Sequence, residues 1–108
     1  MDEVDLKNTT ELIARDFEIA GNPEGITEEE LFDALASQIA YMIEHRLEFL
    51  LSLMYRLDID ERKVEAALSP AAPEMANIGL ARLVLDRQKK RVFTKRFYKP
   101  PKLEDDGW

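Results

Sequence analysis

The sequence predicts an all-α fold: a small helical bundle of about four helices with one long central helix over about residues 28–57. Three observations predict it. Apolar residues recur at helical spacing, helix start and stop signals flank each segment, and strand-like alternation is nearly absent outside residues 92–98. The 108 residues suit a single helical domain over 1–98, followed by an extended C-terminal tail over 99–108.

The first predicted helix follows a polar segment, residues 1–8, which we expect to be frayed. Asn8 or Thr9 is the expected N-cap, because a short polar side chain accepts from the free N–H groups of a first turn. Gly21 is the expected residue after the C-cap, since glycine tolerates a positive φ. A turn with the sequence Asn-Pro-Glu-Gly follows over 22–25.

The long central helix has the clearest start signal. Thr27 followed three residues later by Glu30 predicts a capping box, and Ile26 with Leu31 fits a hydrophobic staple. No proline or glycine interrupts the chain from there until Pro70. The sequence therefore predicts one unbroken helix over about 28–57.

The apolar residues of this segment follow a heptad pattern and form a face wider than a two-stranded seam. Such a helix needs partners on two sides, so it is expected to be the spine of a bundle or part of a dimer interface. Arg46 interrupts the pattern at a core position. We expect it to pair with an acidic residue of a neighbouring helix, although it could also fix the helix register or extend to the bundle edge.

Two shorter helices are predicted after the long one. Asp58 with Glu61 predicts the start of a short helix that turns its apolar residues inward. Pro73 suits the first position of the last helix, which is expected over about 74–95. Pro100 and Pro101 prevent any continuation.

The charge of the chain is unevenly distributed. The net charge is −7, yet residues 82–102 contain nine Lys and Arg against one Asp, a local charge of +8. Residues 1–81 contain six basic and 18 acidic residues, a charge of −12, and residues 103–108 add −3. The basic segment can therefore lie against acidic helices of its own chain or face an anionic partner.

Catalytic and metal-binding patterns are weak. His45 is the one histidine, and Ser37 and Ser52 lie about two helical turns to either side of it, too far for a nucleophile and its base. Glu44, His45 and Glu48 share one predicted helix face, but they are better explained as a solvated face than as metal ligands. We predict no enzymatic activity, no catalytic residue, no metal site and no cofactor.

The location of the protein is predicted from three further features. The chain has no cysteine, which fits a reducing compartment. Its first residues are acidic and lack the pattern of a signal peptide. The longest apolar run, residues 39–43, is far shorter than a membrane span. The expectation is a cytoplasmic protein without a membrane partner.

The basic segment over 82–99 is the strongest candidate interaction surface, because its cations alternate with aromatic residues. Phosphates and stacked bases of a nucleic acid would contact such a surface, although the acidic protein as a whole repels polyanions. The candidate residues are Arg87, Lys89, Lys90, Arg91, Lys95, Arg96, Phe97 and Tyr98. Trp108 is the last residue of the tail over 99–108. The tail could be bound by a partner as a linear motif, or it could fold back so that Trp108 covers the bundle.

Two short segments carry a resemblance. Residues 55–61, Tyr-Arg-Leu-Asp-Ile-Asp-Glu, and residues 83–88, Leu-Val-Leu-Asp-Arg-Gln, resemble small uncharacterised bacterial helical proteins. This resemblance implies a helical fold and no particular activity.

The leading hypothesis is a non-enzymatic protein-interaction module that self-associates through its long helix, as a homodimer, or that binds another protein. The wide apolar face of that helix motivates it. The alternative is a nucleic-acid-associated accessory protein that uses the basic segment 82–99.

Overall fold

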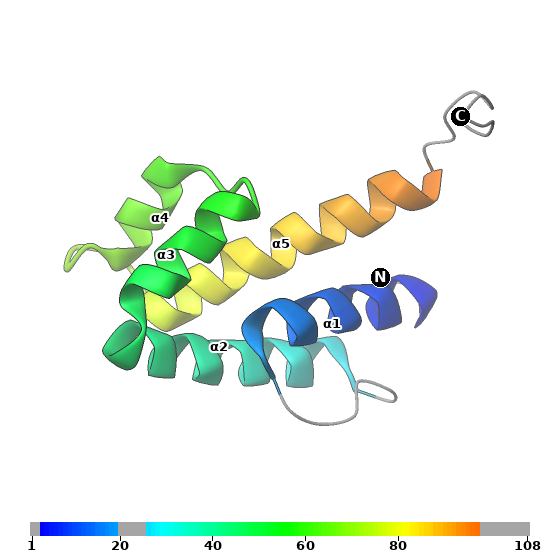
Figure 1. The fold of residues 1–108 in the computed structure, drawn as a ribbon, viewed down its shortest axis with the longest axis horizontal. Helices are drawn as coiled ribbons and strands as arrows, with labels where there is room; N and C mark the ends of the chain where they lie inside the picture. The colour runs from blue at the N-terminus through cyan, green and yellow to red at the C-terminus, as the bar shows by residue number, and fades with distance from the viewer. Residues whose placement is uncertain (1–2, 20–25, 98–108) are drawn as a thin grey trace.

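A computed structural model describes residues 3–19 and 26–97 of the chain, and for residues 96 and 97 the backbone alone. The described part consists of α-helices joined by turns, without a strand (Figure 1), which confirms the predicted all-α class. The predicted tail over 99–108, with Trp108, lies outside the described residues. The helices are α1 (Glu3–Phe17), α2 (Glu28–His45), α3 (Leu47–Arg56), α4 (Glu61–Leu68) and α5 (Ala76–Phe97).

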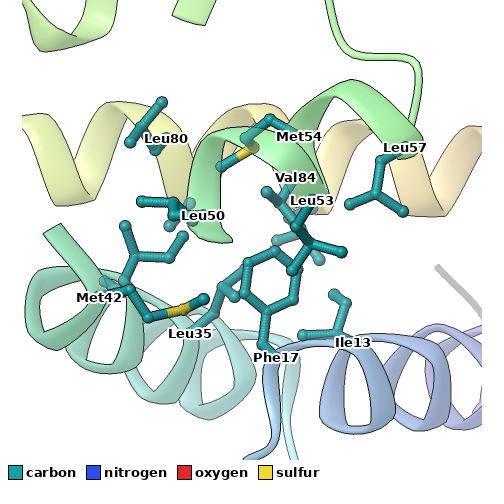
Figure 2. Packing of buried hydrophobic residues seen from close by; sticks show 14 of the residues in the cluster. Ile13, Phe17, Leu35, Met42, Leu50, Leu53, Met54, Leu57, Leu80 and Val84 are labelled. Carbon is teal, nitrogen blue, oxygen red and sulfur yellow. The ribbon is translucent and has the colours of Figure 1, made fainter. Parts of the chain in front are cut away.

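The last helix, α5, is the centre of the arrangement. It packs against α1, α2 and α4, while α2 also contacts α1 and α3. Figure 2 shows side chains from α1, α2, α3 and α5 meeting in one apolar cluster. The fully buried large side chains of this cluster include Ile13, Phe17, Leu35, Ile39, Leu50, Leu80 and Val84. Among the described residues, no helix combines the length and the apolar character needed to cross a membrane.

The start of the first helix differs from the prediction. Residues 3–8 are helical, and neither Asn8 nor Thr9 is an N-cap. The buried face of this helix includes the polar residues Asp5, Thr9 and Thr10. Apolar residues alone therefore did not show the helical spacing of its first half. Thr10 is accommodated there because its hydroxyl donates to the carbonyl of Leu6 at 2.7 Å.

The first helix also ends before the predicted position. Phe17 is its last residue, and Glu18 adopts a left-handed φ of 57°. The N–H of Ile19 donates to the carbonyl of Ala14 at 3.0 Å, a six-residue closure typical of a helix terminus. Glu18 therefore takes the position that we predicted for Gly21, which lies outside the described residues.

The predicted start of the second helix is confirmed. The N–H of Glu30 donates to the Thr27 hydroxyl at 3.1 Å, and the Thr27 N–H donates to the Glu30 carboxylate at 3.0 Å. Ile26 and Leu31 both pack in the apolar cluster, as the staple predicts.

The prediction of one unbroken helix over 28–57 is wrong, because the chain bends at Arg46. This residue has a φ of −145° and a ψ of 47°, outside the helical region. Figure 1 shows the chain turning back between α2 and α3, so that α3 lies over the core. An uninterrupted helix would leave much of its wide apolar face uncovered, whereas the turn buries residues from both halves, such as Ile39 and Leu50.

Two other helix starts lie two to three residues later than predicted. Asp58 is not an N-cap but follows the end of α3 with a φ of 63°, and the N–H of Ile59 closes that end on the carbonyl of Met54. Asp60 caps α4 instead, accepting from the N–H of Arg62 at 2.9 Å. Pro73 lies in the preceding bend rather than at the first position of α5.

Candidate interaction surfaces

The basic residues of α5 fall into two groups, of which the first is paired within the chain. Arg87 donates to the carbonyl of Leu57 at 2.9 Å and lies 3.7 Å from the carboxylate of Asp58, at the end of α3. Lys89 donates to the carboxylate of Glu28 at 2.8 Å, at the start of α2. These two candidate residues therefore hold α5 against its acidic neighbours.

Arg82 belongs to the same paired group. Its guanidinium donates twice to the carboxylate of Glu74, at 3.1 and 3.0 Å, and lies 5.4 Å from the ring centre of Phe32. The hydrogen bond from Arg82 holds the pKa of Glu74 below the ordinary range of a glutamate, and the same bond raises the pKa of Arg82. Both groups are exposed, so this pair fixes local geometry more than it adds stability.

The second group lies at the outer end of α5. Lys90, Arg91 and Lys95 are exposed, and none of them forms an ion pair within the described ranges 3–19 and 26–97. Phe93 belongs to the same stretch of sequence and has 57% of its surface exposed, on the side of the helix that it shares with Lys90. Of the other candidates, Arg96 and Phe97 lie in the helix without described side chains, and Tyr98 lies outside the described residues. Among the described residues, the cations of this segment without an ion pair therefore lie at this end of α5.

An apolar row on α3 was missed by the sequence analysis. Leu47, Leu51 and Tyr55 follow one another at a spacing of four residues, so they share one helix face. All three are exposed, Tyr55 with 82% of its surface. The four-residue spacing itself could have indicated the row.

A groove between α3 and α4 adjoins this row. It encloses about 170 Å³. Its apolar wall consists of Leu51, Met54, Tyr55, Ile59, Val64 and Leu68. Glu61 and Glu65, one turn apart on α4, stand at its edge, and both are exposed. Neither carboxylate has an ion-pair partner in the described part of the chain. The groove is therefore apolar inside and negatively charged at the rim.

A second groove lies between α1 and the outer half of α5, where the two helices diverge in Figure 1. It encloses about 550 Å³, and Val4, Leu12 and Val92 form its apolar part. Glu11, Arg15 and Lys95 also line it, so its charges are mixed. This mixture of both signs indicates no particular class of partner.

The residues around His45 do not form a catalytic or metal-binding site. Glu44 lies 3.6 Å from His45, and the ring of Tyr41 lies 4.7 Å from the histidine ring, with all three exposed. The turn at Arg46 separates this pair from Glu48 on α3. Among the described residues, no group of three or more His, Cys, Asp or Glu side chains could hold a metal ion.

Arg46 pairs with an acidic residue, as predicted, although this acid directly follows α1 and is not part of a helix. Its guanidinium donates to the carboxylate of Glu18 at 2.9 Å and stacks 4.3 Å from the ring centre of Phe49. The side chain is 36% exposed, so the charge extends to the edge of the core and is not buried. The pair ties the end of α1 to the turn between α2 and α3.

Comparisons with protein-family models, with curated proteins and with solved structures found no match to this chain. The resemblance to small bacterial helical proteins stays a prediction.

Proposed function

We propose that the chain is a non-enzymatic protein-interaction module that self-associates as a homodimer through α3. The observation that supports this proposal is the exposed apolar row of Leu47, Leu51 and Tyr55 beside the apolar α3–α4 groove. Contiguous apolar surface of this kind is typical of an interface rather than of a surface that water alone covers. A helix face with anchors four residues apart is a common form of such an interface.

This proposal places the dimer interface on a smaller part of the segment 28–57 than the sequence suggested. The wide apolar face of residues 28–57 motivated that prediction, but most of this face packs within the chain, for example through Leu35, Ile39 and Leu53. The row on α3 points away from that packing. We therefore assign the interface to α3, whereas the apolar residues of α2 pack in the core.

The test is sedimentation equilibrium of the full chain over a wide concentration range. A dimer of the 12.5-kDa chain is expected at high micromolar concentration. The double variant Leu51→Glu/Tyr55→Glu should weaken the dimer at least about a hundredfold, because a buried unpaired carboxylate costs several kcal/mol. Both positions are exposed, so the monomer should keep its helical circular dichroism spectrum.

Met75→Glu is the matched control. Met75 is 74% exposed and lies outside the row and the groove, so this variant also replaces a surface apolar side chain by a carboxylate. It should dimerise like the wild type. A wild-type chain that stays monomeric at all concentrations, or a dimer that tolerates the α3 double variant, would refute the proposal.

A further inference from the structure

The α3–α4 groove and the outer end of α5 complement each other in shape and charge. We propose that two copies of the chain dock reciprocally: Phe93 of each copy enters the α3–α4 groove of the other, and Lys90 beside Phe93 faces the glutamates at the groove rim. This inference rests on the proposed self-association and names the two surfaces that meet.

The size of the groove fits one aromatic ring. It encloses about 170 Å³ between aliphatic and aromatic side chains of α3 and α4. A cavity of about 150 Å³ lined by aliphatic side chains holds one benzene molecule. The phenyl ring of Phe93 has that size, and 57% of the residue surface is exposed on the outer end of α5. Phe93 is therefore the anchor that the groove accommodates.

The charges around the ring and the groove are opposite. Lys90 precedes Phe93 by three residues and so lies on the same side of α5, whereas Arg91, two residues before Phe93, projects from the opposite side. Glu61 and Glu65 line the groove, and the exposed ring of Tyr55 stands beside them. Docking would place Lys90 against two carboxylates and an aromatic face, both of which attract it.

A chain cannot fill its own groove with its own Phe93. The helix α4 contacts α5 near Gly79, where a side chain would lie 3.2 Å from the Cβ of Ala67. Phe93 follows Gly79 by fourteen residues, or about 21 Å along a helix. Figure 1 shows α3 and α4 towards one end of the molecule and the last turns of α5 at the other. The occupant must therefore come from a second copy.

Two-fold symmetry allows both contacts to form at once. When two copies lie antiparallel, the α5 end of each reaches the α3–α4 end of the other, and the same contact forms twice. Such an assembly closes as a dimer instead of growing into a filament. It also brings the basic segment of each chain, +8 over residues 82–102, towards the acidic part of the other.

The test is a charge exchange between two variants of the full chain. The groove variant is Glu61→Lys/Glu65→Lys, and the helix variant is Lys90→Glu. Each variant alone presents like charges at both contacts, so its dimer should be at least about tenfold weaker than the wild type. In an equimolar mixture every contact regains opposite charges. The mixture should therefore form a heterodimer, which native mass spectrometry distinguishes by mass.

Glu29→Lys/Asp33→Lys is the matched control. These two exposed acids of α2 have the same spacing as Glu61 and Glu65 but lie outside the groove. This variant should keep the wild-type dimer and should gain nothing from mixing with the helix variant. Phe93→Ala, which removes the anchor without changing charge, should weaken the dimer in the same assay.

The outcomes separate this inference from the proposed function. A wild-type dimer that both charge variants leave unchanged, or a mixture that stays monomeric, would overturn reciprocal docking while leaving self-association through α3 intact. A monomeric wild type would overturn both. If the helix variant keeps the dimer but loses binding to labelled single- or double-stranded nucleic acid in fluorescence anisotropy, the basic end serves nucleic acid and the inference is wrong.

Discussion

Gln88 lies in the core with its side chain fully buried, and neither atom of its amide has a hydrogen-bond partner among the described residues. A buried polar group without a partner costs about 1–3 kcal/mol. The residue occupies the inner face of α5, where its neighbours one turn away are Val84, Leu85 and Val92. An apolar side chain of similar length should therefore fit this position better.

We predict that Gln88→Met raises the free energy of unfolding by about 1–3 kcal/mol, because methionine has the length of glutamine without its polar atoms. Thermal unfolding should shift upward by several degrees. Gln38→Met, at a half-buried position of α2, is the control and should change stability by less than about 0.5 kcal/mol. A destabilised Gln88→Met variant would contradict the prediction.

The pair of Glu74 and Arg82 predicts a pH dependence. The pKa of Glu74 is lowered in the folded chain by the hydrogen bond from Arg82, so its contribution to stability is complete above the unfolded pKa of a glutamate, about 4.3. The contribution is lost as pH falls from there through the folded pKa. Thermal unfolding of wild type and Glu74→Gln should thus differ near neutral pH and converge in acid. A difference that grows in acid would contradict this assignment.

At the scale of elements, the contact between α4 and α5 depends on the small side chains at their crossing. A Cβ at Gly79 would lie 3.2 Å from the Cβ of Ala67, which is tighter than ordinary packing. Glycine is unfavourable inside a helix by about 1 kcal/mol relative to alanine, so its presence in α5 needs a packing reason. The close approach of α4 supplies that reason.

We predict that Gly79→Leu destabilises the fold by about 1–3 kcal/mol, because the larger side chain forces α4 away from α5. Chemical denaturation followed by circular dichroism measures this change. Thr94→Leu adds a leucine at an exposed position of the same helix and should be nearly neutral. Equal stability of the two variants would show that the α4–α5 contact is not tightly packed.

At the scale of the whole molecule, the uneven charge of the sequence is divided by the fold. Part of the basic segment is neutralised internally, through Arg82, Arg87 and Lys89, and part remains at the outer end of α5. The acidic groove lies at the other end. If this separation drives reciprocal docking, the dimer should weaken as salt is raised, because exposed charges are screened beyond about 8–10 Å near physiological ionic strength. A dimer that is indifferent to salt would point to apolar contacts alone.

The sequence by itself determined what depends on local chemistry. Helical spacing predicted the all-α class, and the Thr27–Glu30 capping box predicted the start of α2, since both signals act within one or two turns. The pairing of Arg46 with an acid followed from the cost of a charge within an apolar pattern.

Only the tertiary structure decided features that depend on residues far apart in the chain. The bend at Arg46 has no proline or glycine to mark it, and it forms because turning back buries more apolar surface. The partners of Lys89 and Arg87 lie 61 and 30 residues away, so no local pattern could separate the paired cations from the exposed ones. The groove beside Tyr55 was not predicted either, because it depends on how α3 and α4 are placed relative to each other.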